Sequence, residues 1–214
     1  MGRMRADPGI DAPTRDLAGF PIKEMTGAAQ LFRAVTTGRT PWWFGSDGSQ
    51  RFDVPPPGGT CYVGLDIPTA IREKGRRAVL STGKLDPDFL ASFDVYELRL
   101  PSKMFLADST KDAAVDFGAN RELATALDYT VTCQWAAAFV DAGFDGLLYT
   151  SRYTSGMEPN AVAVFNDHGD AGWPHVRKIA ALEAVIESGL DHMLLTHPTS
   201  AKATMATPPP RRKP

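Results

Sequence analysis

The chain has 214 residues and a formal net charge of -2, with 23 Lys and Arg residues against 25 Asp and Glu residues. Its composition, 43% hydrophobic and 22% charged, is typical of a soluble globular protein that is long enough to bury one sizeable core. The near-neutral charge argues against a direct nucleic-acid partner or an anionic membrane, and no apolar run reaches the ~18 residues of a membrane span.

Both ends of the chain are predicted to lack order. Residues 1–25 are rich in Pro, Gly, Asp and Arg, show no hydrophobic periodicity and lack the apolar core of a secretory signal. Residues 197–214 include the low-complexity stretch PPPRRKP, which is interpreted as a solvated tail rather than a docking peptide. Because no internal repeat or long linker is found, residues 26–196 are predicted to form one domain.

Strand and helix patterns alternate through this domain. The predicted elements are strands at 30–35, 60–64, 95–100, 103–107, 146–150 and 161–165, with helices at 67–77 and 130–144. The apolar stripe of the second helix is Val131, Trp135, Ala138, Phe139 and Ala142. Gly143 follows this stripe and is expected to end the helix. The mixture predicts an α/β or α+β fold with polar side chains at strand ends.

Two arginines are the first candidates for ligand binding. Arg33 interrupts an apolar strand, and Arg51 opens the segment RFDVPPPGGTCYVG. A guanidinium group stays charged, so inside an apolar stretch it needs an anionic or hydrogen-bonding partner. Two such groups near a loop rich in Gly and Pro suit a diphosphate or carboxylate ligand. The alternatives are an internal salt bridge for Arg33 and an ordinary loop position for Arg51.

Tyr62 and Glu73 continue from Arg51 at equal intervals of eleven positions. Tyr62 lies on a predicted strand, and the helix that follows returns Glu73 toward it. A phenol stacks on flat heteroaromatic rings, and a carboxylate orients ribose hydroxyls or stabilises an oxocarbenium ion. The alternative is a solvated glutamate on a charged helix face.

Ser151 and Arg152 directly follow the buried strand 146–150. Polar residues at such strand ends commonly contact ligands, although a turn serine or a capping hydroxyl is the alternative. The pattern G-x-S-x-G is absent, so the sequence does not support a hydrolase nucleophile elbow at this serine.

Several other classes of site are not supported. Cys61 and Cys133 form no C-x-x-C pair, and both are interpreted as small buried hydrophobes in a reducing cytoplasm. The four histidines form no compact ligand cluster, so no metal is predicted. GxGxxG and P-loop patterns are absent. The aromatic residues 42–44 are expected to form a partly buried wall rather than an exposed binding patch.

Three segments together resemble one known family. LFRAV, then GSQRFDVPPPGGTCYVGLDIPTAIRE, then AGFDGLLYTSR with AVAVF after it resemble the RES-domain family, which is named for its Arg, Glu and Ser. The resemblance covers most of residues 29–166, but residues 78–128 carry no signature that aligns. It implies that the catalytic residues are Arg33, Glu73 and Ser151.

The resemblance also implies a fold, a substrate and a partner. The fold would be a compact α+β domain similar to diphtheria-toxin-like ADP-ribosyltransferases, with small sheets around an NAD⁺ cleft and flanking helices. Family members resemble cytoplasmic toxins that degrade NAD⁺ as glycohydrolases or phosphorylases, with water or inorganic phosphate as acceptor. An antitoxin with an Xre-like region usually holds them inactive. The NAD⁺-binding residues would be Arg33, Arg51 and Tyr62, and Arg152 joins them as a candidate from its position at the strand end beside Ser151.

Three alternatives remain open from the sequence. An ADP-ribosyltransferase that modifies a macromolecule would share the NAD⁺ site and differ in the acceptor. A non-catalytic binding module would keep the fold alone, although the intact set of candidate residues argues against it. An NAD⁺-cleaving enzyme without an antitoxin is the third.

Overall fold

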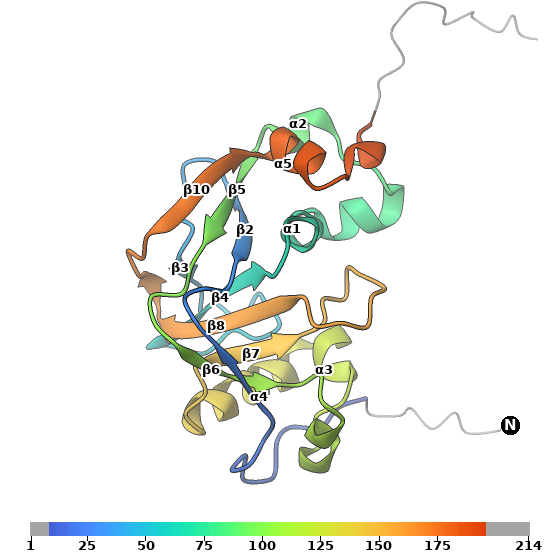
Figure 1. Cartoon of the computed structure of the whole chain (residues 1–214). Helices are drawn as coiled ribbons and strands as arrows, with labels where there is room; N and C mark the ends of the chain where they lie inside the picture. Colours follow the sequence, from blue (N-terminus) through green and yellow to red (C-terminus); the bar gives the residue numbers. More distant parts are fainter. Residues whose placement is uncertain (1–8, 196–214) are drawn as a thin grey trace, which may run out of the picture.

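The computed structural model describes residues 9–195, and residues 77–80 by their backbone alone, as a mixed α+β fold (Figure 1). Its main sheet has eight strands in the order β1-β6-β7-β8-β4-β2-β5-β10. The strands are β1 (Ile22–Met25), β2 (Leu31–Thr36), β4 (Gly58–Gly64), β5 (Phe93–Leu98), β6 (Met104–Asp108), β7 (Gly146–Tyr149), β8 (Ala161–Asp167) and β10 (His175–Ala180). Neighbouring strands are antiparallel except β6 and β7. A small second sheet pairs β3 (Trp43–Phe44) with β9 (Gly169–Asp170).

Helices cover the two ends of this sheet (Figure 1). They are α1 (Ile67–Thr82), α2 (Pro87–Leu90), α3 (Glu122–Thr125), α4 (Tyr129–Asp141) and α5 (Ala181–Glu187), with 3-10 turns at Asp112–Phe117 and Asp191–Met193. Buried residues of α1, α2 and α5 form one hydrophobic cluster with β2 and β5. Residues of α3 and α4 form another with β6, β7 and β8. Each group of helices therefore covers its own half of the sheet.

The two halves of the sheet are joined at one residue pair. Strands β2 and β4 pair only through Phe32 and Gly64, whereas β4 pairs with β8 over its whole length. A third hydrophobic cluster combines residues of β2 and β5 with residues of β4, β6, β7 and β8. The two half-sheets are therefore held together by this shared core, with a seam between β2 and β4.

Helix α1 begins immediately after that seam. A Cβ atom on Gly64 would lie 2.9 Å from both the Ala70 nitrogen and the Asp66 oxygen, so only glycine fits where the strand turns into the helix. The Asp66 carboxylate accepts a 2.6 Å hydrogen bond from the Thr69 N–H and caps the first turn. Arg76, with φ at 44°, introduces a kink. This start point decides which side chains of α1 face the seam.

Most predicted elements are confirmed, with shifted ends. All six predicted strands and both predicted helices are present. In α4, Trp135 and Phe139 are buried as predicted, together with Thr132 and Ala136, whereas Ala142 is exposed. Gly143, with φ at 85°, follows the end of this helix as expected.

The prediction that residues 1–25 lack order is wrong for residues 9–25, the part of this segment that the structure describes. Residues 9–25 are packed and paired: Ile10, Leu17 and Phe20 belong to a hydrophobic cluster, and β1 pairs with β6. The Trp135 indole N–H donates a 2.8 Å hydrogen bond to the Asp11 carbonyl. The predicted disordered tail at 197–214 lies outside the described residues.

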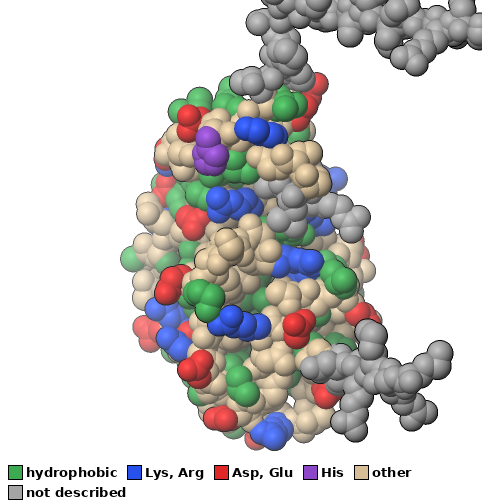
Figure 2. All heavy atoms as spheres, turned by 90° about the vertical axis from the view of Figure 1, so that its right-hand side faces the viewer, with side chains coloured by type: hydrophobic (Ala, Val, Ile, Leu, Met, Phe, Trp, Pro, Cys, Tyr) green, Lys and Arg blue, Asp and Glu red, His purple; other side chains and the backbone are tan. Residues whose placement is uncertain are grey.

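Figure 2 shows one face of the molecule, the right-hand side of Figure 1, where Lys and Arg side chains are interspersed with Asp and Glu. This face therefore presents both signs of charge. In the described part of the chain, no helix combines the length and apolar character that crossing a bilayer requires.

Candidate functional site

A cleft of about 690 Å³ lies at the seam between β2 and β4. Phe32 and Gly64, the pair that joins the half-sheets, both line it. Four predicted site residues also line it, namely Arg33, Arg51, Tyr62 and Glu73. Because they come from β2, the loop before β4, β4 itself and α1, the fold brings together residues that are distant in sequence.

Glu73 is held in this cleft by Ser151. The Ser151 hydroxyl donates a 2.5 Å hydrogen bond to Glu73 Oε1. Glu73 follows Ala70 by one helical turn, at the flank of the buried stripe of α1, so its side chain projects toward the cleft. The alternative of a glutamate on an outward charged face does not apply, because Glu73 is half-buried and paired with Ser151.

Ser151 is placed by the exit of β7 from the sheet. Its backbone N–H donates to Asn160 Oδ1 at 2.8 Å, and its hydroxyl oxygen accepts from the Tyr153 N–H at 3.2 Å. Ser151 is buried, with 2% of its surface exposed. Since its hydroxyl proton is given to Glu73, its direct effect is to orient that carboxylate.

Burial raises the pKa of Glu73 above its ordinary value of 4.5. The Ser151 hydrogen bond and then the positive charge of Arg51 act against this rise in pKa. Arg152 adds a smaller effect of the same sign. Arg152 does not line the cleft, and its guanidinium carbon lies 5.8 Å from the ring centre of Tyr153.

Arg51 is a buried cation, with 8% of its surface exposed. Its Nε and Nη2 atoms donate to the Ala126 carbonyl at 3.4 and 3.2 Å, and its guanidinium lies 5.1 Å from the ring centre of Tyr129. No carboxylate oxygen lies within salt-bridge distance of it among the described side chains. Arg51 therefore lies in a loop, as expected, and its side chain is fixed in the wall of the cleft.

Arg33 is anchored by polar atoms of the protein rather than by a carboxylate. Its Nη1 atom donates to the Pro41 and Trp43 carbonyls at 2.6 and 3.0 Å, and to Cys61 Sγ at 3.0 Å. These contacts connect β2 to the loop around β3 and to β4. The hydrogen-bonding partner that the sequence predicted for this arginine is thus found, and among the described side chains the internal salt bridge is not.

Three further cations line the cleft, Arg39, Lys74 and Arg76, and the sequence did not single them out. Lys74 Nζ donates to Thr36 Oγ1 at 2.7 Å, and Arg76 donates to Gln50 Oε1. None of them forms an ion pair with a described side chain. Burial, followed by the charge of Arg39, lowers the pKa of Lys74. The cleft therefore has an excess of positive charge that an anionic ligand would offset.

Tyr62 is held by a network that includes Asp53, which the sequence also did not single out. The Tyr62 hydroxyl accepts from the Phe52 N–H at 2.8 Å and donates to Asp53 Oδ1 at 3.0 Å. Asp53 is buried, and this burial raises its pKa. Only its position two residues after Arg51 in a loop rich in turn residues was visible in the sequence.

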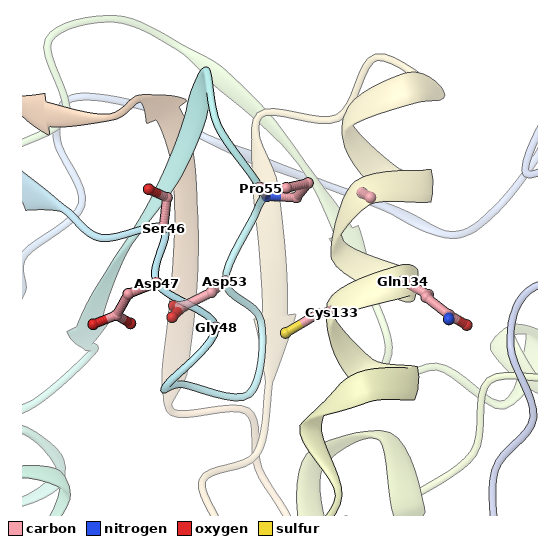
Figure 3. Close-up of a pocket in the computed structure, with 8 residues that line it drawn as sticks. Ser46, Asp47, Gly48, Asp53, Pro55, Cys133 and Gln134 are labelled. Carbon is pink, nitrogen blue, oxygen red and sulfur yellow. The ribbon is translucent and has the colours of Figure 1, made fainter.

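A second cavity, of about 370 Å³, lies on the other side of this loop (Figure 3). Asp47 and Asp53 line both cavities, so the loop is a thin wall between them. In Figure 3 the Cys133 sulfur points from α4 toward the loop. Cys133 is half-buried, whereas Cys61 is fully buried as expected.

Aromatic side chains form much of the remaining wall. Trp42 and Phe44 are buried, as predicted, and Trp43 between them is 47% exposed and lines the cleft. Tyr129, Tyr149 and Tyr153 also line the cleft. Among residues 9–195, no cluster of three or more His, Cys, Asp or Glu has metal-site geometry.

Comparisons with known proteins place the chain in a family. A search of curated proteins finds no match. A chain in the crystal structure of the M.tuberculosis MbcT-MbcA toxin-antitoxin complex has a similar fold, with a TM-score of 0.56 and 13% sequence identity over 78% of this chain and 91% of that chain. Residues 30–186, most of the domain, match the family described as RES domain. The chain therefore belongs to the RES-domain family.

Proposed function

We propose that this protein degrades NAD⁺ by cleaving the bond between nicotinamide and ribose. The observation that supports this most directly is a half-buried carboxylate, Glu73, oriented by Ser151 in a cleft whose cations have no carboxylate partner among the described side chains. NAD⁺ combines a diphosphate, which suits the cations, with a positively charged nicotinamide riboside, which suits the carboxylate. Membership of the RES-domain family supports the same substrate.

In the proposed complex, Arg51 and Arg33 bind the diphosphate. Arg51 is buried without an ion pair to any described side chain, so an anionic ligand would supply the partner it lacks. The Arg33 side chain is held by hydrogen bonds to the loop around β3. A diphosphate bound by Arg33 would therefore have a fixed position relative to that loop. Tyr62 borders the nicotinamide with its ring, because its hydroxyl is occupied by Phe52 and Asp53.

Bond cleavage proceeds through an oxocarbenium-like ribose. The electron pair of the N-glycosidic bond leaves with nicotinamide, which departs as a neutral molecule and needs no proton. The Glu73 carboxylate contacts the ribose and stabilises the developing positive charge. Water then adds to the ribose carbon and loses a proton, giving ADP-ribose, or inorganic phosphate adds and gives ADP-ribose 1-phosphate.

The test is mass spectrometry of NAD⁺ incubated with the purified full chain, with and without inorganic phosphate. We expect free nicotinamide in both samples, with ADP-ribose identifying a glycohydrolase and the sugar 1-phosphate identifying a phosphorylase. Label from NAD⁺ that stays on a macromolecule would instead indicate ADP-ribosyl transfer. Intact NAD⁺ in both samples, with no heat of NAD⁺ binding by calorimetry, would refute the proposal.

The rate should depend on pH through Glu73. Because burial raises its pKa, the carboxylate becomes protonated at a higher pH than an exposed glutamate, and activity is lost on the acid side above the ordinary value of 4.5. Ser151→Ala removes a hydrogen bond that lowers this pKa, so the acid limb of kcat/KM should move to still higher pH. A pH profile of both proteins checks this, and an unchanged acid limb would show that Ser151 does not act through the carboxylate.

We further propose that the chain is the toxin of a cytoplasmic toxin–antitoxin pair, with an Xre-like region in its partner. The similar fold in the MbcT-MbcA complex and the family membership support this role. Expression of the chain alone in bacteria should deplete NAD⁺ and stop growth, and co-expression of the partner should restore both. Normal growth and normal NAD⁺ levels during expression of the soluble chain would contradict the toxin role.

A further inference from the structure

Tyr149 is a buried phenol at the end of β7, and its side chain is 3% exposed. Its ring packs edge-on against Phe52, with the ring centres 5.1 Å apart and the planes at 66°. It lines the cleft and lies two residues before Ser151 on the same strand exit. Alternate residues of an extended chain point the same way, so Tyr149 faces the side on which Ser151 holds Glu73.

The Tyr149 hydroxyl has no hydrogen-bond partner among the described residues. Every fully buried side-chain nitrogen or oxygen atom in this part of the chain does have such a partner. The Tyr149 hydroxyl oxygen is therefore not fully buried, and the space it reaches is the cleft that its side chain lines. An unpaired donor on a residue that is only 3% exposed indicates a ligand atom opposite it.

Tyr62 shows the contrast. Both phenols line the same cleft, but the Tyr62 hydroxyl accepts one hydrogen bond from Phe52 and donates another to Asp53. Tyr62 can therefore offer the ligand its ring, whereas Tyr149 can offer its O–H group.

We propose that the Tyr149 hydroxyl donates a hydrogen bond to an oxygen atom in the nicotinamide riboside half of the substrate. This inference rests on the proposed function, because it takes the substrate to be NAD⁺. The riboside half is assigned because Tyr149 lines the cleft two residues before Ser151, which holds Glu73, and Glu73 is the group placed at the ribose.

The phenol acts as a donor rather than as a base. Burial, followed by the negative charge of Glu73, raises the pKa of Tyr149 well above 10, so the hydroxyl keeps its proton at neutral pH. No proton transfer is required, and the hydroxyl replaces a hydrogen bond that the substrate oxygen gives up when it leaves water.

The test is Tyr149→Phe, which removes the hydroxyl and keeps the ring against Phe52. We expect kcat/KM for NAD⁺ to fall about 10- to 100-fold, the range that corresponds to leaving one partly buried polar group of the substrate without its hydrogen bond. ADP lacks the riboside half, so its inhibition constant should be unchanged. Equal kcat/KM in variant and wild type, or a matching loss of ADP inhibition, would overturn the assignment.

Stability separates this role from a structural one. Tyr149→Phe breaks no hydrogen bond within the described protein, so its thermal midpoint should match that of the wild type. Tyr62→Phe is the matched control, since the Phe52 N–H and Asp53 Oδ1 both lose the hydroxyl they are bonded to, which should lower the midpoint. A midpoint for Tyr149→Phe as low as that of Tyr62→Phe would overturn the proposal.

Two further outcomes are distinguishable. The defect of Tyr149→Phe should be the same at neutral and mildly alkaline pH, and a defect that grows with pH would indicate a tyrosinate base instead. If wild-type protein neither binds nor cleaves NAD⁺, the proposed function fails, and the assignment of Tyr149 fails with it. If only the variant comparison is negative, the proposed function stands without Tyr149.

Discussion

Glu73→Gln should reduce nicotinamide release from NAD⁺ by about 10²–10³-fold. The substitution removes the negative charge that we propose faces the ribose and leaves the shape of the side chain nearly unchanged. The amide oxygen that replaces the carboxylate can still accept the hydrogen bond from Ser151, so the local geometry is retained. A steady-state assay of nicotinamide release measures the effect, and wild-type activity in this variant would remove Glu73 from the mechanism.

The same variant should be at least as stable as the wild type. A raised pKa in the folded protein means that folding disfavours the ionised carboxylate, so Glu73 favours the folded state only when pH is low enough to protonate it. At neutral pH the carboxylate lowers the free energy of unfolding, and glutamine removes that penalty. Loss of activity with an unchanged or higher urea midpoint would separate a role in chemistry from a role in folding.

Phe20→Ala should destabilise the protein by about 3–5 kcal/mol, the usual cost of truncating a buried phenylalanine. Phe20 is 1% exposed, and its ring contacts Phe117, Phe139 and Phe144, with ring centres 5.0–6.1 Å apart. Since domains of this size are stable by roughly 5–15 kcal/mol, the loss is a large share of the total. Urea denaturation measures it.

Ile22→Ala is the matched control for Phe20→Ala. Ile22 comes from the same N-terminal segment but is 60% exposed on β1, so its truncation should change stability by about 0.5 kcal/mol or less. Equal and small effects at both positions would mean that the N-terminal segment does not contribute to the core.

The sequence predicted the central elements well because their signals are local. Strands such as 146–150 and 161–165 are continuous apolar runs, and α4 has a clear helical stripe. The N-terminal segment was missed because its order depends on distant partners. Ile22 pairs with Ala107 in the sheet, and the Asp11 carbonyl accepts a hydrogen bond from the Trp135 indole. Neither contact produces a recognisable pattern in the sequence of residues 9–25.

The candidate site was predictable only in part, for the same physical reason. Arg33, Arg51, Tyr62 and Glu73 were found as unusual residues in apolar or loop contexts and by family resemblance, and the fold brings them to one cleft. Tyr149 was not distinguished, because a tyrosine that ends a buried strand looks like an ordinary core residue. Its proposed role rests on a hydroxyl without a hydrogen-bond partner among the described residues, and this can be recognised only when all neighbouring side chains are placed.

The seam between β2 and β4 has a mechanical consequence. Hydrogen-bond ladders make a sheet stiff, but here one pair, Phe32 and Gly64, bridges the two halves. A molecule seated across the gap cross-links the halves and adds its binding energy to the fold, about 2.7 kcal/mol at a hundredfold excess over Kd. With the proposed substrate NAD⁺ as that molecule, the protein would lose this added stability as it degrades the NAD⁺ in solution.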